Sequence, residues 1–90
     1  MPIKYLLEDI EDYEREIRDL KIRLEFYQSQ VKLYKRKANA ERDYDFIVKL
    51  MLSFVDDYTK KYVECRSNLA IAERNLRVAK LRLKRYFEEV

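Results

Sequence analysis

Histidine and glycine are absent from this sequence of 90 residues, and proline and cysteine occur once each. Without histidine the chain has no imidazole to act as a base near neutral pH or as a metal ligand, which also excludes di-iron bundle sites of the Glu-x-x-His type. Without glycine it has no glycine-rich loop of the kind that cradles phosphate groups. We therefore expect a protein that is not an enzyme and that uses no cofactor or metal.

The single cysteine, Cys65, has no partner for a disulfide within the chain, which favours a reducing compartment. Nothing near the N-terminus resembles a signal peptide. The most apolar run, residues 46–55, contains Lys49 and is about half the length needed to span a bilayer. These features predict a cytoplasmic protein in which Cys65 is a buried structural thiol.

Charged residues make up 41% of the chain and hydrophobic residues 48%, with a formal net charge of +3. This composition is typical of coiled coils and long helices. Heavy charge, abundant tyrosine and few amides also resemble proteins from hot environments, so a thermophilic or viral source is a hypothesis for its origin. A chain this short buries little surface alone, which favours association with itself or a partner.

Apolar residues return at alternating spacings of three and four, the heptad pattern of helices that supercoil against a partner. The first stripe comprises Ile3, Leu6, Ile10, Tyr13, Ile17, Leu20, Leu24, Tyr27, Val31, Tyr34 and Ala38. The second comprises Tyr44, Val48, Met51, Val55, Tyr58, Tyr62, Cys65, Leu69, Ala72, Leu76, Ala79, Leu83, Tyr86 and Val90. Continuing the first heptad would place Glu41 and Asp45 in the core, so the two stripes indicate two helices.

We predict a single domain over residues 1–90, with one helix at about 3–38, a turn at 39–43 and a second helix at about 44–90. Asn39 tolerates the left-handed conformation that ends helices, and Asp43 is a good N-cap. Residues 40–42 are good helix formers, however, so a single bent helix is the alternative.

Folding back at this turn predicts an all-α, antiparallel two-helix coiled-coil hairpin. In the predicted register Ile17 faces Cys65, Leu24 faces Tyr58, and Ile3 faces Ala79, which leaves the rest of the second helix unpaired as a tail. Residues 1–30 carry five basic and eight acidic side chains and lie beside residues 73–85, which carry six basic and one acidic. This charge contrast favours the antiparallel orientation. A swapped or extended antiparallel dimer has the same layers of facing residues, so the pattern does not distinguish it from the hairpin.

The third and seventh heptad positions of both helices fall on one side of such a hairpin, and many of them are apolar. We expect this side to bind another protein or a second copy, giving a four-helix bundle or higher oligomer. The alternative is that these residues enlarge the hairpin's own seam. The predicted interface comprises Ile22, Phe26, Leu33, Phe46, Ile47, Leu50, Phe54, Ile71 and Val78, with Leu81, Leu83, Tyr86, Phe87 and Val90 on the tail.

A basic segment near the C-terminus could contact nucleic acid through phosphate groups. Its side chains spread around the helix, and nearby glutamates are spaced to pair with several of them, so a solvated surface is the competing interpretation. The function that we favour is a non-enzymatic helical assembly or adaptor protein acting through protein contacts. The alternative is a basic helical nucleic-acid-binding protein or small regulator, and association with a membrane surface is the least favoured class. The segment comprises Arg74, Arg77, Lys80, Arg82, Lys84 and Arg85.

Overall fold

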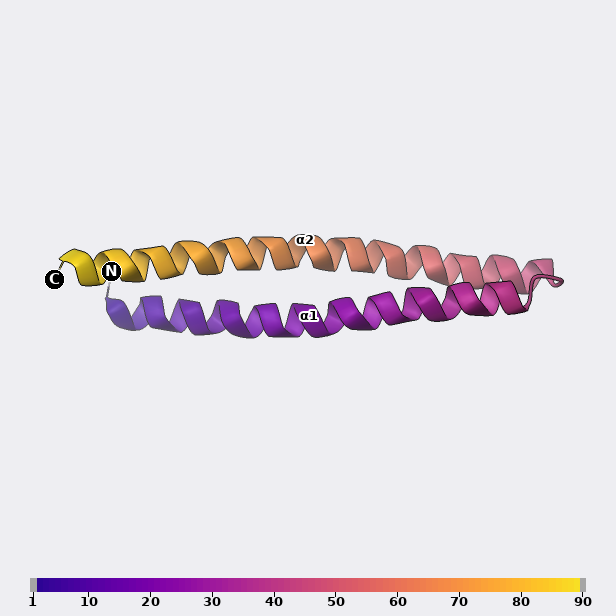
Figure 1. Cartoon of the computed structure of the whole chain (residues 1–90), viewed down its shortest axis with the longest axis horizontal. Coiled ribbons are helices and arrows are strands. Elements are labelled where there is room, and N and C mark those ends of the chain that lie inside the picture. The colour runs from indigo at the N-terminus through magenta and orange to yellow at the C-terminus, as the bar shows by residue number, and fades with distance from the viewer. Residues whose placement is uncertain (1, 90) are drawn as a thin grey trace.

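The computed structural model describes residues 2–89, which form two long helices and one turn. Helix α1 spans Ile3–Ala40 and helix α2 spans Asp45–Glu89. The helices lie side by side and antiparallel, joined at one end, with both termini at the other end (Figure 1). The molecule is a rod that extends over 70 × 14 × 14 Å. The predicted all-α helical hairpin is confirmed, and the single bent helix is excluded.

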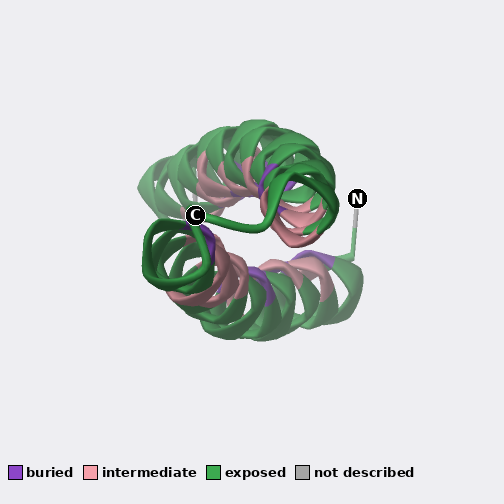
Figure 2. Cartoon of the chain, turned by 90° about the vertical axis from the view of Figure 1, so that its right-hand side faces the viewer, coloured by how far each residue is buried: buried purple, intermediate pink, exposed green. Residues whose placement is uncertain are grey.

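The two heptad stripes form the seam between the helices. Viewed along the rod, buried and half-buried residues occupy the facing sides of α1 and α2, and exposed residues occupy the outer sides (Figure 2). Within residues 2–89 no polar or charged side chain is buried. The buried residues all belong to the stripes, and they are Leu6, Ile10, Ile17, Leu20, Ala38, Val55, Cys65, Ala72 and Ala79.

Large side chains of α1 pack over small side chains of α2. Ile17 and Leu20 cluster with Cys65 and Ala72, and Ala72 is the most buried residue of the seam at 2% exposed. Nearer the open end, Leu6 and Ile10 cluster in the same way with Ala79. Alternating sizes allow the two helices to interdigitate at high density. The predicted burial of Cys65 is confirmed: its thiol donates a hydrogen bond of 3.3 Å to the main-chain carbonyl of Leu20.

The turn lies later in the chain than the sequence predicted. Helix α1 continues through Asn39, and residues 2–89 include no residue with a positive φ, so the predicted left-handed end at Asn39 is wrong. The helix ends instead at Ala40, and the N–H of the C-cap residue Glu41 still donates a hydrogen bond to the carbonyl of Lys37. The carbonyl of Tyr44 accepts the first hydrogen bond of α2, so Tyr44 rather than Asp43 holds the N-cap position. Tyr44 is consequently 62% exposed and not in the seam as predicted.

The register between the helices also differs from the predicted one. The Cys65 thiol bonds the carbonyl of Leu20, whereas Ile17 was its predicted partner. The ring of Tyr58 lies 6.3 Å from that of Tyr27 and 5.8 Å from that of Tyr34, whereas Leu24 was its predicted partner. Both partners are displaced along α1 toward the turn, as expected when the turn itself moves in that direction.

The unpaired tail is therefore shorter than predicted. Leu83 is half-buried and packs against the cluster formed by Leu6, Ile10 and Ala79, so the hairpin itself covers this predicted interface residue. Tyr86, a predicted seam residue, is 37% exposed because it lies near the end of α1. Val90 lies outside the described residues.

Candidate interaction surface

The hairpin has two long sides that differ in their heptad positions. The Phe26 side carries the third and seventh positions of both helices, and the Val63 side carries the second and fifth. One groove and one ion pair, each formed by residues of both helices, agree with this division. A shallow groove on the Phe26 side is lined by Arg23 together with Lys61 and Asn68, and Glu14 lies 4.0 Å from Lys80 on the Val63 side.

Large apolar side chains gather on the Phe26 side in the turn half of the rod, with Ile22 and Phe46 at the border of this side. We call this group the turn-end surface. The exposed fraction is 66% for Ile22, 51% for Phe26, 78% for Phe46 and 41% for Leu50. The structure thus leaves much of the predicted interface open to solvent at this end. Its seven residues are Ile22, Phe26, Leu33, Phe46, Ile47, Leu50 and Phe54.

Part of the turn-end surface also belongs to the hairpin's own packing. Leu33, Ile47 and Phe54 are half-buried, and the ring centroid of Phe54 lies 4.9 Å from that of Tyr34. The Phe26 ring meets Tyr58 edge-on at 6.3 Å. The alternative interpretation, in which these side chains enlarge the seam, therefore holds for Leu33, Ile47 and Phe54. These ring contacts fix the positions of the Phe26 and Phe54 side chains in the turn-end surface.

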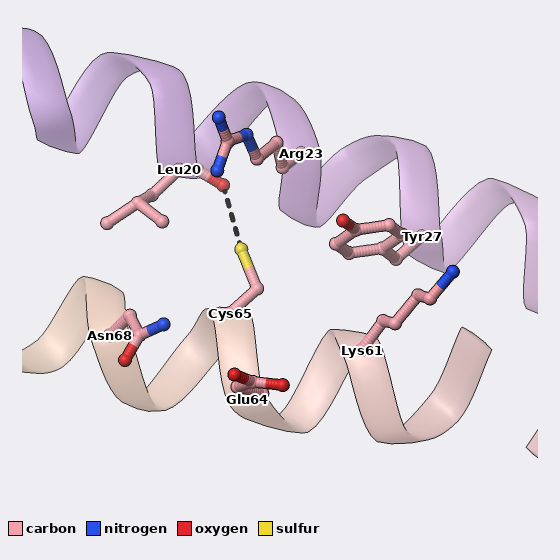
Figure 3. A pocket seen from close by; sticks show the side chains of 7 residues that line it. All are labelled: Leu20, Arg23, Tyr27, Lys61, Glu64, Cys65 and Asn68. Atoms are coloured by element: carbon pink, nitrogen blue, oxygen red, sulfur yellow. Dashed lines mark hydrogen bonds between the residues drawn. The ribbon is translucent and has the colours of Figure 1, made fainter. Parts of the chain in front are cut away.

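The Phe26 side becomes polar toward the middle of the rod. Figure 3 shows Arg23, Lys61, Glu64 and Asn68 around the groove where the Cys65 thiol meets α1. A neighbouring groove adds the carboxylates of three residues on the same side. Charge therefore follows the turn-end surface on the side away from the turn, where Ile22 lies at the border beside Arg23. The three carboxylates are those of Asp12, Glu16 and Asp19.

The predicted interface residues nearer the open end form a second and sparser group. Ile71, Val78, Leu81 and Phe87 are each at least 40% exposed. Val78 shares its groove with Asp9, Asn75 and Arg82, so polar side chains interrupt this group. This second group is not continuous with the turn-end surface.

Three exposed apolar residues were missed by the sequence prediction, namely Leu7, Leu52 and Val63. Their exposed fractions are 46%, 46% and 60%. Each occupies a second or fifth heptad position, and this position in the sequence could have indicated its exposure. The three residues are widely spaced along the Val63 side. Scattered apolar residues of this kind are ordinary on protein surfaces.

The basic segment remains dispersed in the structure. All six of its side chains belong to exposed residues. Lys80 lies 4.0 Å from Glu14 and Lys84 lies 4.0 Å from Glu88, so two of the six have acidic neighbours. The others point to different sides of α2, and no continuous basic stripe results.

Within residues 2–89, no three side chains of the His, Cys, Asp and Glu types lie close enough together to hold a metal ion. Neither described helix combines the length and the apolar character needed to cross a membrane. Searches of protein-family models, curated proteins and solved structures find no match for the chain.

Proposed function

We propose that this chain is a non-enzymatic helical assembly or adaptor module that acts through protein contacts made by the turn-end surface. The observation that carries this proposal is the exposure of Phe26 and Leu50 on one side of the turn half of the rod, with Ile22 and Phe46 exposed at the border of that side. Contiguous large apolar side chains on a small protein usually mark a contact site. A reducing cytoplasmic location belongs to the same proposal, since the one cysteine is a free, buried thiol.

The shape of the hairpin supports this proposal. Its seam is filled by the two heptad stripes, so the exposed members of the turn-end surface, Ile22, Phe26, Phe46 and Leu50, are extra apolar area that the chain does not need for its own core. Aromatic side chains fixed by neighbouring rings lose little entropy on binding, which favours a contact role. A second helical hairpin laid on this side would complete a four-helix bundle.

The proposal is tested by placing a photoreactive phenylalanine analogue at Phe46 in the cells that make the protein. The control places the same analogue at Val63, which is similarly exposed but lies on the other side of the rod. We expect ultraviolet light to give covalent adducts of the Phe46 variant with protein, of its own or another kind, and far fewer with the Val63 variant. Equal yields from the two positions would contradict the proposal.

Binding of nucleic acid through the basic segment is checked by gel retardation over a range of salt concentrations. Neutralising several phosphates makes affinity fall steeply as salt rises. The dispersed cations described above predict weak retention that does not depend on sequence. Tight, salt-sensitive retention that is lost in an Arg77→Gln, Arg85→Gln variant would instead support the nucleic-acid-binding alternative.

A further inference from the structure

We propose that the partner of the turn-end surface is a second copy of this chain, bound turn to turn with the two open ends pointing away from each other. This inference rests on the proposed function and specifies its partner. The two hairpins would be related by a twofold axis that crosses the rod at the level of Leu33 and Phe54. Only the turn halves of the two rods would overlap.

The turn-end surface is suited to meet itself across such an axis. Leu33 lies next to Tyr34, whose ring is 4.9 Å from that of Phe54, so Leu33 and Phe54 are at one level of the rod. Phe26 lies to one side of this level, toward the open end, and Ile47 lies to the other, toward the turn. A twofold axis at the middle lays α1 on α1 and α2 on α2, so Leu33 and Phe54 of one copy meet Leu33 and Phe54 of the other, and Phe26 lies at the level of Ile47 on the neighbouring helix.

Charges on the Phe26 side are complementary under the same rotation. Because the axis lays α1 on α1 and α2 on α2, Arg23 and Lys61 of each copy meet the turn end of the same helix in the other. Arg23 lies ten residues from Leu33 toward the open end, and Asp43 lies ten residues from it toward the turn. Lys61 lies seven residues from Phe54 toward the open end, and Asp45 lies nine residues from it toward the turn. At the helical rise these offsets match within about 3 Å, so each cation arrives near an acidic residue of the opposite turn. The acidic residues of the turn are Glu41, Asp43 and Asp45.

Arrangements in which the rods overlap along their full length are less favourable. If the rods ran in the same direction, α1 of one copy would lie on α2 of the other, and the cations Arg23 and Lys61, which line one groove, would face the same cations of the other copy. If they ran in opposite directions, the carboxylates of Asp12, Glu16 and Asp19 would lie over the turn-end surface. Like charges and unpaired charges on apolar surface both oppose association, so the turn-to-turn overlap is preferred.

The overlap is large enough for a specific dimer. It covers about 20 residue levels, or about 30 Å, and two helices side by side are about 20 Å wide. One face of these dimensions buries roughly 600 Å² per copy, near the lower limit for stable interfaces. We therefore expect a dimer that dissociates on dilution.

Sedimentation equilibrium of Leu50→Glu and Leu52→Glu tests the inference with a matched pair. The two residues are similarly exposed, at 41% and 46%, but point to opposite sides of α2 because two residues turn a helix by about 200°. We expect Leu50→Glu to weaken dimerisation at least tenfold and Leu52→Glu to change it less than twofold. Circular dichroism on both variants verifies that they remain helical. Equal effects would overturn the inference.

A spin label at Ile71, introduced as Ile71→Cys in a Cys65→Ser background, tests the orientation. Ile71 lies 17 residues beyond Phe54 along α2, about 25 Å from the proposed axis. The turn-to-turn dimer predicts an inter-label distance of about 50 Å, whereas full overlap in either direction predicts about 20 Å. The short distance would overturn the inference. A purified protein that stays monomeric, combined with Phe46 adducts to a different protein, would also overturn it but leave the proposed function standing.

Discussion

Leu20→Ala is expected to lower the free energy of unfolding by about 2–5 kcal/mol. Leu20 is 7% exposed and packs in the central cluster with Ile17, Cys65 and Ala72. Removing its side chain loses the transfer free energy of the buried carbons and leaves a cavity that two stiff helices fill only in part. Urea denaturation followed by circular dichroism measures the change. All proteins must be compared at one chain concentration, since association adds to apparent stability.

Val63→Ala is the control for this prediction. Val63 is 60% exposed and lies in the middle of α2, two residues from Cys65. Surface substitutions of this kind usually change stability by less than about 0.5 kcal/mol. A loss at Val63 as large as that at Leu20 would mean that the helices do not meet along the stripe that contains Leu20.

Ala72→Glu is expected to have a still larger effect and to unfold most of the protein at room temperature. Ala72 is 2% exposed and lies against Ile17 and Leu20. A glutamate there buries an unpaired carboxylate, at a cost of about 3–5 kcal/mol, and its larger side chain also overpacks the seam, which costs about 1–3 kcal/mol more. Together these costs are comparable to the total stability of a small domain. Circular dichroism at 25 °C would report the loss of helix.

Ala70→Glu provides the same substitution two residues away, at an exposed position of the same helix. Glutamate and alanine are both good helix formers, so this variant should remain folded with a midpoint of denaturation close to that of the unchanged protein. If both glutamates were tolerated, the seam would not run through Ala72.

Burial in the seam could be predicted from the sequence alone because it depends only on periodicity. Every buried residue, from Leu6 to Ala79, lies on one of the two heptad stripes. An apolar stripe on a long helix has few ways to leave water other than against another such stripe. The fold class and the antiparallel pairing follow from this.

The register could not be predicted in the same way. A heptad stripe matches its partner again after a slide of seven residues, so Tyr58 finds apolar neighbours opposite Leu24 and equally opposite Val31, between Tyr27 and Tyr34. The position of the turn selects between these registers. The position of the turn depends on weak local preferences. Asn39 stays in the helix because Ala38 is buried and Ala40 favours helix. The later turn then shortens the unpaired tail of α2.

The candidate surface was predictable in part. Heptad position alone correctly placed Phe26, Phe46 and Leu50 outside the seam, where they are exposed. It could not show that Phe54 would be half-buried, because that depends on the ring of Tyr34 across the seam. Predicting contacts between side chains of different helices requires knowledge of the register, which only the structure provides.

The most direct test of the central claim compares how far the methyl groups of Leu50 and Leu52 are accessible to a soluble paramagnetic agent in methyl-labelled protein. In a single hairpin the two side chains are about equally exposed, at 41% and 46%. If the turn-end surface is covered in the assembled protein, the Leu50 signals will broaden several times less than the Leu52 signals at high concentration, and the two will converge on dilution. Equal broadening of Leu50 and Leu52 at every concentration would contradict the account.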